Sequence, residues 1–200
     1  MKINTSESGL HNLRSFIGQL ADVPEKEWNY FAEKVTERIF NKHQLLFQAG
    51  EPVPNFFFIS KGLVRFYYLT EKGKEFNKAF AIENEFVGSF SAMIFNAPCR
   101  YSVQALEKTE VLVIPVRLIQ NSYDRHPAWE RVGRRHAESV AVKKEIREGE
   151  FLLDSAETRY RRLLADHPTL IDRVQQYHIA SYLGITDVAL SRIRNKIGLT

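Results

Sequence analysis

The stretch HIASYLGITDVALSRIRNKI, residues 178–197, has the pattern of two short helices joined by a tight turn. A helix-turn-helix needs a small residue where the helices cross, a glycine in the turn and five apolar residues that fix the angle between them. Ala180 is the small residue and Gly184 the turn glycine. The apolar positions are filled by Ile179, Leu183, Ile185, Leu190 and Ile193. The stretch therefore predicts a DNA-binding helix-turn-helix; the alternative is a helical hairpin that only closes a small core.

The second helix of this motif is expected to run from Asp187 to about Ile197, with Thr186 as its N-cap. The side chains expected on its outward face are of kinds that can contact the edges of base pairs. Arg192 can bridge guanine O6 and N7, Asp187 can accept from a cytosine amino group, and Val188 can touch a thymine methyl. The candidate base-reading residues are Asp187, Val188, Ser191, Arg192 and Asn195.

Basic residues around the motif are candidates for contacts with the DNA backbone, which position a protein without reading sequence. They are Arg159, Arg161, Arg162, Arg194 and Lys196. The first three lie on the expected outward face of a helix that Asp154 can cap, with Glu157 closing a capping box. Residues 155–200 carry seven Lys/Arg against four Asp/Glu, whereas residues 1–154 carry 21 against 20. A basic segment on a near-neutral body suits a polyanion, although many solvated helices carry a similar charge.

The composition is that of a soluble globular protein. No run of about 18–20 apolar residues is available to span a membrane, and the first residues lack the apolar core of a secretion signal. We therefore expect a cytoplasmic protein. Cys99 is the single cysteine, which excludes an internal disulfide and a cysteine-bound iron–sulfur cluster.

Short strands are predicted between about residues 36 and 116. The segments NFFFISKG, LVRFYYL, EFNKAFA, YSVQAL and EVLVIPV are aromatic or β-branched and are separated by turns that contain glycine. Strands in such number with no helix between them indicate a sandwich or barrel, with a jelly roll favoured. Two helices precede them. The first carries Leu13 and Ile17 on one face, and Pro24 opens the second, which carries Trp28 and Phe31.

A long helix is predicted from Pro127 to about Leu152. Its heptad seam mixes apolar and polar residues, so the coiled-coil pattern is weak. We expect the same helix of a second chain to pack against its apolar face, which would form a homodimer. The expected dimer contacts are Trp129, Val132, Val140 and Ile146. The alternative is that this face packs on its own β-domain.

This order of elements resembles the Crp/Fnr family of transcription regulators. The β part of the resemblance rests on FQAGEPVPNFFFISKGLVRFYYL and NEFVGSF, where Gly50, Gly62 and Gly88 stand at turns of the family's cyclic-nucleotide-binding fold. The helical part rests on HPAWERVGRRHAESV and YHIASYLGITDVALSRIRNKI, which is close to the short, nucleotide-independent members of Bacteroidetes-type bacteria. The resemblance implies a homodimer on a two-fold symmetric site of double-stranded DNA, with RNA polymerase as a further candidate partner.

The nucleotide pocket departs from what the resemblance implies. Members that bind cyclic AMP use a glutamate after the cassette glycine and an Arg-Ser pair about ten residues on. Here Ser89 follows Gly88, and Cys99-Arg100 stands where the pair belongs, so the arginine is one residue out of register. The candidate pocket residues are Gly88, Ser89, Arg100 and Tyr101. We predict no response to cyclic AMP, and either another small-molecule effector or none.

No cofactor and no metal are expected. The N-terminal cysteines of the family's redox members are missing, and the six histidines are scattered. A cupin-type metal enzyme would need a His-x-His pair, yet residues 36–116 hold only His43. A nucleophilic role for Cys99 lacks a histidine nearby in the sequence. The chain is thus not expected to be an enzyme.

The predicted fold class is α+β: an N-terminal β-roll (a double-stranded jelly roll) with flanking helices, a long connecting helix and a C-terminal helix-turn-helix domain without a wing. The expected domains are the β-roll over 1–125, the connecting and dimerisation helix over 126–153 and the DNA-binding domain over 154–200. The alternative function is a degenerate nucleotide-binding fold that senses a ligand or acts as a protein-interaction scaffold.

Overall fold

The computed structural model describes residues 7–199, and its first two helices are α1 (Glu7–Leu20) and α2 (Glu25–Ala32). Leu13 and Ile17 of α1 are buried, as are Trp28 and Phe31 of α2, which confirms the faces that their spacing predicts. Pro24 caps α2 at the position where a missing N–H removes no helical hydrogen bond.

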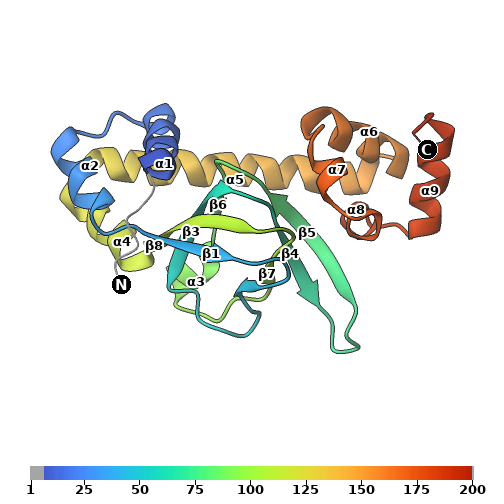
Figure 1. Cartoon of the computed structure of the whole chain (residues 1–200), viewed down its shortest axis with the longest axis horizontal. Helices are drawn as coiled ribbons and strands as arrows, with labels where there is room; N and C mark the ends of the chain where they lie inside the picture. Colours follow the sequence, from blue (N-terminus) through green and yellow to red (C-terminus); the bar gives the residue numbers. More distant parts are fainter. Residues whose placement is uncertain (1–6, 200) are drawn as a thin grey trace. The chain divides into compact units, whose positions relative to one another are not determined.

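The strands that follow form an antiparallel β-roll. They are β1 (Thr36–Phe40), β2 (Leu45–Phe47), β3 (Asn55–Lys61), β4 (Val64–Leu69), β5 (Glu75–Ala81), β6 (Phe86–Val87), β7 (Ser102–Ala105) and β8 (Thr109–Pro115). The short helix α3 (Phe90–Phe95) lies between β6 and β7 in the sequence. One four-stranded sheet has the order β1-β8-β3-β6 and the other the order β2-β7-β4-β5 (Figure 1). The predicted α+β class with its jelly-roll-like strands is confirmed.

Strand β3 shows why the roll is stable. Successive side chains of a strand point to opposite faces, and here both faces are covered. Phe56 and Phe58 belong to the core beneath the N-terminal helices. Phe57 points the other way, where its ring meets those of Phe40 and Phe47. A strand buried on both sides reads as a continuous apolar run, which is the pattern of residues 56–59.

Two of the three glycines singled out in the β-roll are turn glycines. Gly50 has φ +89° and Gly62 has φ +111°, a region that side chains with a Cβ rarely adopt. Gly88 has no positive φ, so its expected role as a turn glycine is wrong. A Cβ at Gly88 would lie 2.4 Å from Cδ1 of Phe56, so this position needs glycine for close packing.

Helix α4 (Val116–Arg125) and the start of α5 (Pro127–Leu153) complete the core of the roll with α1 and α2 (Figure 1). Trp129 of α5 is 3% exposed, and its ring stacks on that of Phe31 at a centroid distance of 4.5 Å. Val132 packs against the same core. The expectation that Trp129 is available for a dimer contact is therefore wrong, because it is buried by aromatic packing within its own chain, whereas Val132 is only half-buried.

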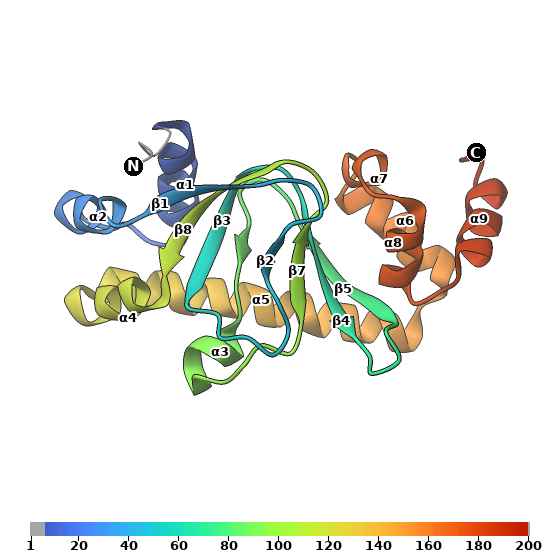
Figure 2. The same ribbon diagram turned by 60° about the horizontal axis from the view of Figure 1, so that its bottom comes forward.

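The C-terminal helices are α6 (Ala156–Asp166), α7 (Leu170–Arg173), α8 (Gln176–Leu183) and α9 (Asp187–Lys196) (Figure 2). Tyr160 and Leu163 form the buried face of α6, as predicted. Its N-cap is Ser155, whose Oγ accepts a hydrogen bond from the Thr158 amide. The expected cap, Asp154, is wrong by one residue.

By its internal contacts the chain divides into two compact units. The N-terminal unit comprises residues 1–66 and 80–139, and the C-terminal unit comprises residues 67–79 and 140–200. The second unit thus includes the turn between β4 and β5 as well as the predicted DNA-binding segment. Helix α5 is continuous in sequence through the division at residues 139 and 140.

Candidate nucleic-acid interface

The turn between α8 and α9 has the geometry that the sequence predicts. Gly184 adopts φ +71°, and the amide of Ile185 donates to the carbonyl of Ala180 at 3.0 Å. This bond closes the C-terminus of α8 in the way that a left-handed glycine permits. Two residues later, the Oγ1 of Thr186 accepts from the Ala189 amide at 3.2 Å and starts α9.

Three of the five apolar positions predicted for the motif are buried, and Ile185 and Ile193 are half-buried. Ala180, the small crossing residue, is buried together with Ile179, Leu183 and Leu190. Because these side chains come from both helices, they fix the angle at which α9 leaves the turn. The angle determines which side chains of α9 remain outside.

Every predicted base-reading residue lies on the exposed face of α9. Asp187, Val188, Ser191, Arg192 and Asn195 are all exposed. Val188 is 62% exposed and takes no part in the core of the motif. Within the described residues, the side chain of Arg192 makes no hydrogen bond and no ion pair. Its guanidinium is thus available to a ligand.

The predicted phosphate contacts are not free in the same way. Arg161 and Lys196 both bind the carboxylate of Glu157, at 3.0 and 2.6 Å. The hydrogen bond from Lys196, followed by that from Arg161, lowers the pKa of Glu157. Arg162 binds the carboxylates of Glu150 and Asp154. Such exposed pairs are weak, so a phosphate can replace them.

Arg159 has a structural role that the sequence did not suggest. Its guanidinium donates to the carbonyls of Asp154 at 2.7 Å and Leu183 at 3.0 Å. Those carbonyls lie next to the end of α5 and at the end of α8, where no further helical amide can satisfy them. The expectation that Arg159 faces outward toward DNA is therefore wrong.

Arg147 completes this arrangement, and the sequence analysis missed it. It donates to the Tyr182 carbonyl at 2.8 Å, and its burial lowers the pKa of the guanidinium. Arg147 and Arg159 each lie 4.7 Å from the centroid of the Phe151 ring. We call Arg147, Phe151 and Arg159 the arginine clamp of α8. The i, i+4 spacing of Arg147 and Phe151 was the one available sequence clue.

A second support for α8 comes from β5 and lies within the same C-terminal unit. Asn77 is buried, and its side chain donates to the His178 carbonyl at 2.9 Å. The backbone N–H of Asn77 donates to the Oγ of Ser181 at 3.0 Å. These partners are about one hundred residues apart in sequence, so no local pattern could have predicted the contact.

Arg194 is also held within the fold. Its guanidinium donates to the hydroxyl of Tyr160, a fully buried residue, at 2.9 Å. Arg194 is half-buried, and its backbone lies in the last turn of α9. This bond ties α9 to α6.

The candidate ligand-pocket residues are only partly brought together. Ser89 is buried, and its Oγ accepts from the Ala92 amide to cap α3. The Tyr101 hydroxyl donates to the Gly88 carbonyl at 2.6 Å. Arg100, by contrast, is exposed and has no hydrogen-bond or ion-pair partner among residues 7–199.

Of the remaining dimer candidates, Val140 is half-buried and Ile146 is 57% exposed. Val142, which the heptad seam passed over, is 54% exposed and lies four residues before Ile146. Residues at this spacing share one face of a helix. The middle of α5 therefore carries an uncovered apolar face in the C-terminal unit.

Comparison with known proteins supports this description. Residues 37–126 match the cyclic nucleotide-binding domain family. Over 86 residues, 43% of the chain, the sequence is 30% identical to the "Anaerobic regulatory protein" of Pasteurella multocida. The match spans 31% of that relative, so the chain covers less than a third of its length.

Several solved structures resemble the fold of most of the chain. FixK2 from Bradyrhizobium japonicum has a TM-score of 0.70 at 20% identity, covering 82% of this chain and 84% of its own. CooA from Carboxydothermus hydrogenoformans, solved as a mutant, has a TM-score of 0.70 at 18% identity, with 98% and 87% covered. The c-di-GMP responsive global regulator CLP of Xanthomonas campestris has a TM-score of 0.69 at 15% identity, with 88% and 92% covered.

These matches define the class of the chain. Residues 37–126 match the cyclic nucleotide-binding domain family, and the fold of the chain is that of FixK2 and CooA. The fold that the resemblance to the Crp/Fnr family implies is thereby confirmed. Within residues 7–199, no helix is long and apolar enough to cross a bilayer, and no three acidic, histidine or cysteine side chains are grouped to bind a metal.

The arginine clamp generates a test that separates it from the surface arginines. Arg159→Gln should destabilise the C-terminal unit by about 1–3 kcal/mol, because it leaves helix-terminal carbonyls without donors. Arg161→Gln is the matched control on the same helix, and it should leave stability unchanged within error. Hydrogen exchange of the α8 amides in increasing urea reports the difference. Equal protection of α8 in the two variants would show that Arg159 does not hold this helix.

Proposed function

We propose that the chain is a sequence-specific, DNA-binding transcription regulator of the Crp/Fnr type. The observation that carries the proposal is the exposed face of α9, where Asp187, Val188 and Arg192 lie free on a helix whose opposite side is buried. A helix presented in this way fits the major groove of DNA, and side chains of these kinds can contact the base edges there. Arg161, Arg162 and Lys196 are the candidate phosphate contacts.

The competing function is a protein-interaction scaffold in which the helix-turn-helix no longer binds DNA. The unengaged Arg192 favours DNA, because a solvent-facing arginine beside an exposed valine has no role in the stability of the motif. Salt dependence separates the two, since contacts with phosphates release counterions. A mobility shift on random duplex that weakens with rising salt supports the regulator, and no shift at either salt concentration supports the scaffold.

We further propose that the protein does not respond to cyclic AMP. A carboxylate to grip the ribose is missing after Gly88, and Ser89 is used to cap α3. Arg100 is exposed rather than directed at a phosphate site. The proposed domains are a β-roll over 1–125, the connecting helix over 126–153 and a DNA-binding domain over 154–200. A cytoplasmic, non-enzymatic protein fits this role, as does burial of the Cys99 thiol.

A homodimer is the proposed functional unit. Trp129 is buried in the core of its own chain, so we propose that the contact lies on Val142 and Ile146 of α5. Val140 is half-buried and, two residues before Val142, faces the other side of the helix. A two-fold dimer would present two copies of α9 to successive half-sites of a symmetric DNA site. RNA polymerase is the candidate further partner at such a site.

The role of Arg192 can be tested on DNA sites selected from random duplex by the wild-type protein. Arg192→Ala should cost about 1–3 kcal/mol on a selected site and much less on random duplex, because it removes a base contact. Arg162→Ala should lower the affinities for the selected site and for random duplex about equally. It should also reduce the slope of log affinity against log salt concentration by roughly one. Arg117→Ala changes an exposed arginine of α4 and should leave both affinities unchanged. Equal losses on both duplexes for Arg192→Ala would mean that α9 is not the reader.

Cyclic AMP binding can be measured directly by titration calorimetry. Loss of a bidentate charged contact alone weakens an affinity by on the order of a hundredfold. We therefore expect no heat of binding at micromolar cyclic AMP. Micromolar binding that disappears in Arg100→Ala would show that this arginine enters the pocket after all.

The dimer contact can be tested with a charge placed on the apolar face of α5. Ile146→Glu should convert the protein to a monomer at about 10 µM, because a carboxylate would be buried without a partner. Lys144→Glu lies two residues away on the opposite side of the helix and should remain a dimer. Sedimentation velocity distinguishes the species. A wild-type monomer, or a dimer that survives Ile146→Glu, would contradict the assignment.

A further inference from the structure

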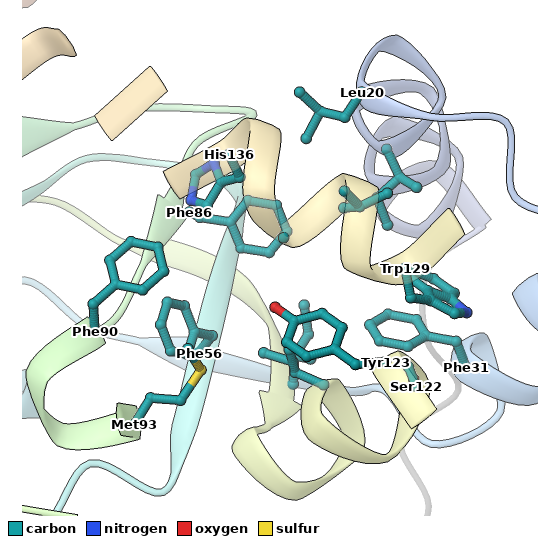
Figure 3. Close-up of a pocket in the computed structure, with 15 residues that line it drawn as sticks. Leu20, Phe31, Phe56, Phe86, Phe90, Met93, Ser122, Tyr123, Trp129 and His136 are labelled. Carbon is teal, nitrogen blue, oxygen red and sulfur yellow. The ribbon is translucent and has the colours of Figure 1, made fainter. Parts of the chain in front are cut away.

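The N-terminal unit contains a cavity that none of the functions above uses. Its volume is about 60 Å³, and residues of α1, α2, α3, α4, α5 and the sheet that contains β3 line it (Figure 3). The wall is mostly aromatic and aliphatic, with Phe56, Phe86 and Phe90 on one side and Trp129 on the other. Gly88 and Ser89 do not line it, so it is distinct from the candidate nucleotide pocket.

Three other polar side chains line the wall. The Nε1 of Trp129 is buried without a partner among the described residues, and Figure 3 shows it on the side of the indole away from the Tyr123 hydroxyl. The Oγ of Ser122 donates to the Leu118 carbonyl at 2.7 Å and is buried. The imidazole of His136 is packed against aromatic rings, with that of Phe86 at 5.1 Å and that of Phe90 at 5.9 Å. None of the three carries the argument for a ligand.

The hydroxyl of Tyr123 is different. It has no hydrogen-bond partner in the described part of the chain, and burial raises the pKa of this phenol. Figure 3 shows its oxygen directed into the cavity, between the side chains of Phe56 and Phe86. Tyr123 is half-buried, and its hydroxyl faces a mostly apolar wall that offers it no acceptor, so a ligand group that accepts its hydrogen bond is favoured there.

Gly133 of α5 makes room for this hydroxyl. A Cβ at this position would lie 2.3 Å from the Tyr123 oxygen, so any other residue would displace the ring. The glycine costs helix stability, since glycine is less favourable than alanine inside a helix by about 1 kcal/mol. Here it leaves a donor exposed to the cavity instead of covering it.

We propose that this cavity binds a small uncharged organic molecule, largely apolar, with one hydrogen-bond acceptor that meets the Tyr123 hydroxyl. The apolar wall excludes a charged ligand, because a buried charge would have no counter-charge. The volume sets the size. An engineered cavity of about 150 Å³ holds benzene, so this one suits a smaller molecule such as a short-chain ketone. The proposal does not depend on DNA binding, and its test uses none.

The full-length protein with 13C-labelled methionine methyl groups provides the readout, because Met93 lines the cavity. 2-Butanone serves as the probe with an acceptor and xenon as the probe without one. Both should shift the Met93 methyl signal saturably. Tyr123→Phe should lower the affinity for 2-butanone by about fivefold to tenfold, which corresponds to the loss of one hydrogen bond. It should leave the affinity for xenon unchanged.

Tyr177→Phe is the matched control, since it removes an exposed hydroxyl of the C-terminal unit that does not line the cavity. It should leave the affinity for 2-butanone as in the wild type. The proposal is overturned if neither probe gives a saturable Met93 shift. It is equally overturned if Tyr123→Phe and Tyr177→Phe bind 2-butanone with the same affinity, because the Tyr123 hydroxyl would then not recognise the acceptor.

Discussion

The last carbonyls of α8 must find donors from outside the helix, and the C-terminal unit is organised around that requirement. A helix that stops at a left-handed glycine leaves several carbonyls without helical amides. Arg147 supplies a donor to Tyr182, and Arg159 supplies one to Leu183. The ring of Phe151 lies against both guanidinium groups. Because α9 starts only a few residues later, the direction of the exposed helix follows from these bonds.

The same constraint explains why Gly184 has little freedom to change. Besides its positive φ, a Cβ here would lie 2.9 Å from the Phe151 ring. The turn residue and the clamp thus depend on each other: the ring can sit under both arginines because the glycine leaves it space. Packing of this kind resists small distortions, since close-packed interiors transmit strain instead of absorbing it.

Short-range patterns were the part of the fold that sequence could predict. The helix-turn-helix, its cap at Thr186 and the exposed residues of α9 follow from rules that act over a single turn or two. Errors arose where a residue's partner is distant. Arg159 looks like a surface arginine until Leu183 is brought beside it, and the heptad seam through Trp129 cannot tell a second chain from Phe31 of the same chain. The start of α6 was also predicted one residue too early, since its N-cap is Ser155 and not Asp154.

The two ways in which arginine is used here differ in what could replace it. Arg161 and Arg162 meet carboxylates at an exposed surface, and Lys196 already performs the same task on Glu157, so lysine is an adequate substitute at those positions. Arg159 spans carbonyls at the ends of two helices with one planar group and lies against an aromatic ring. An ammonium is a compact point charge without that fork, so exchange to lysine there is not conservative. Among the arginines of α6, charge is therefore the required property at two positions and shape at the third.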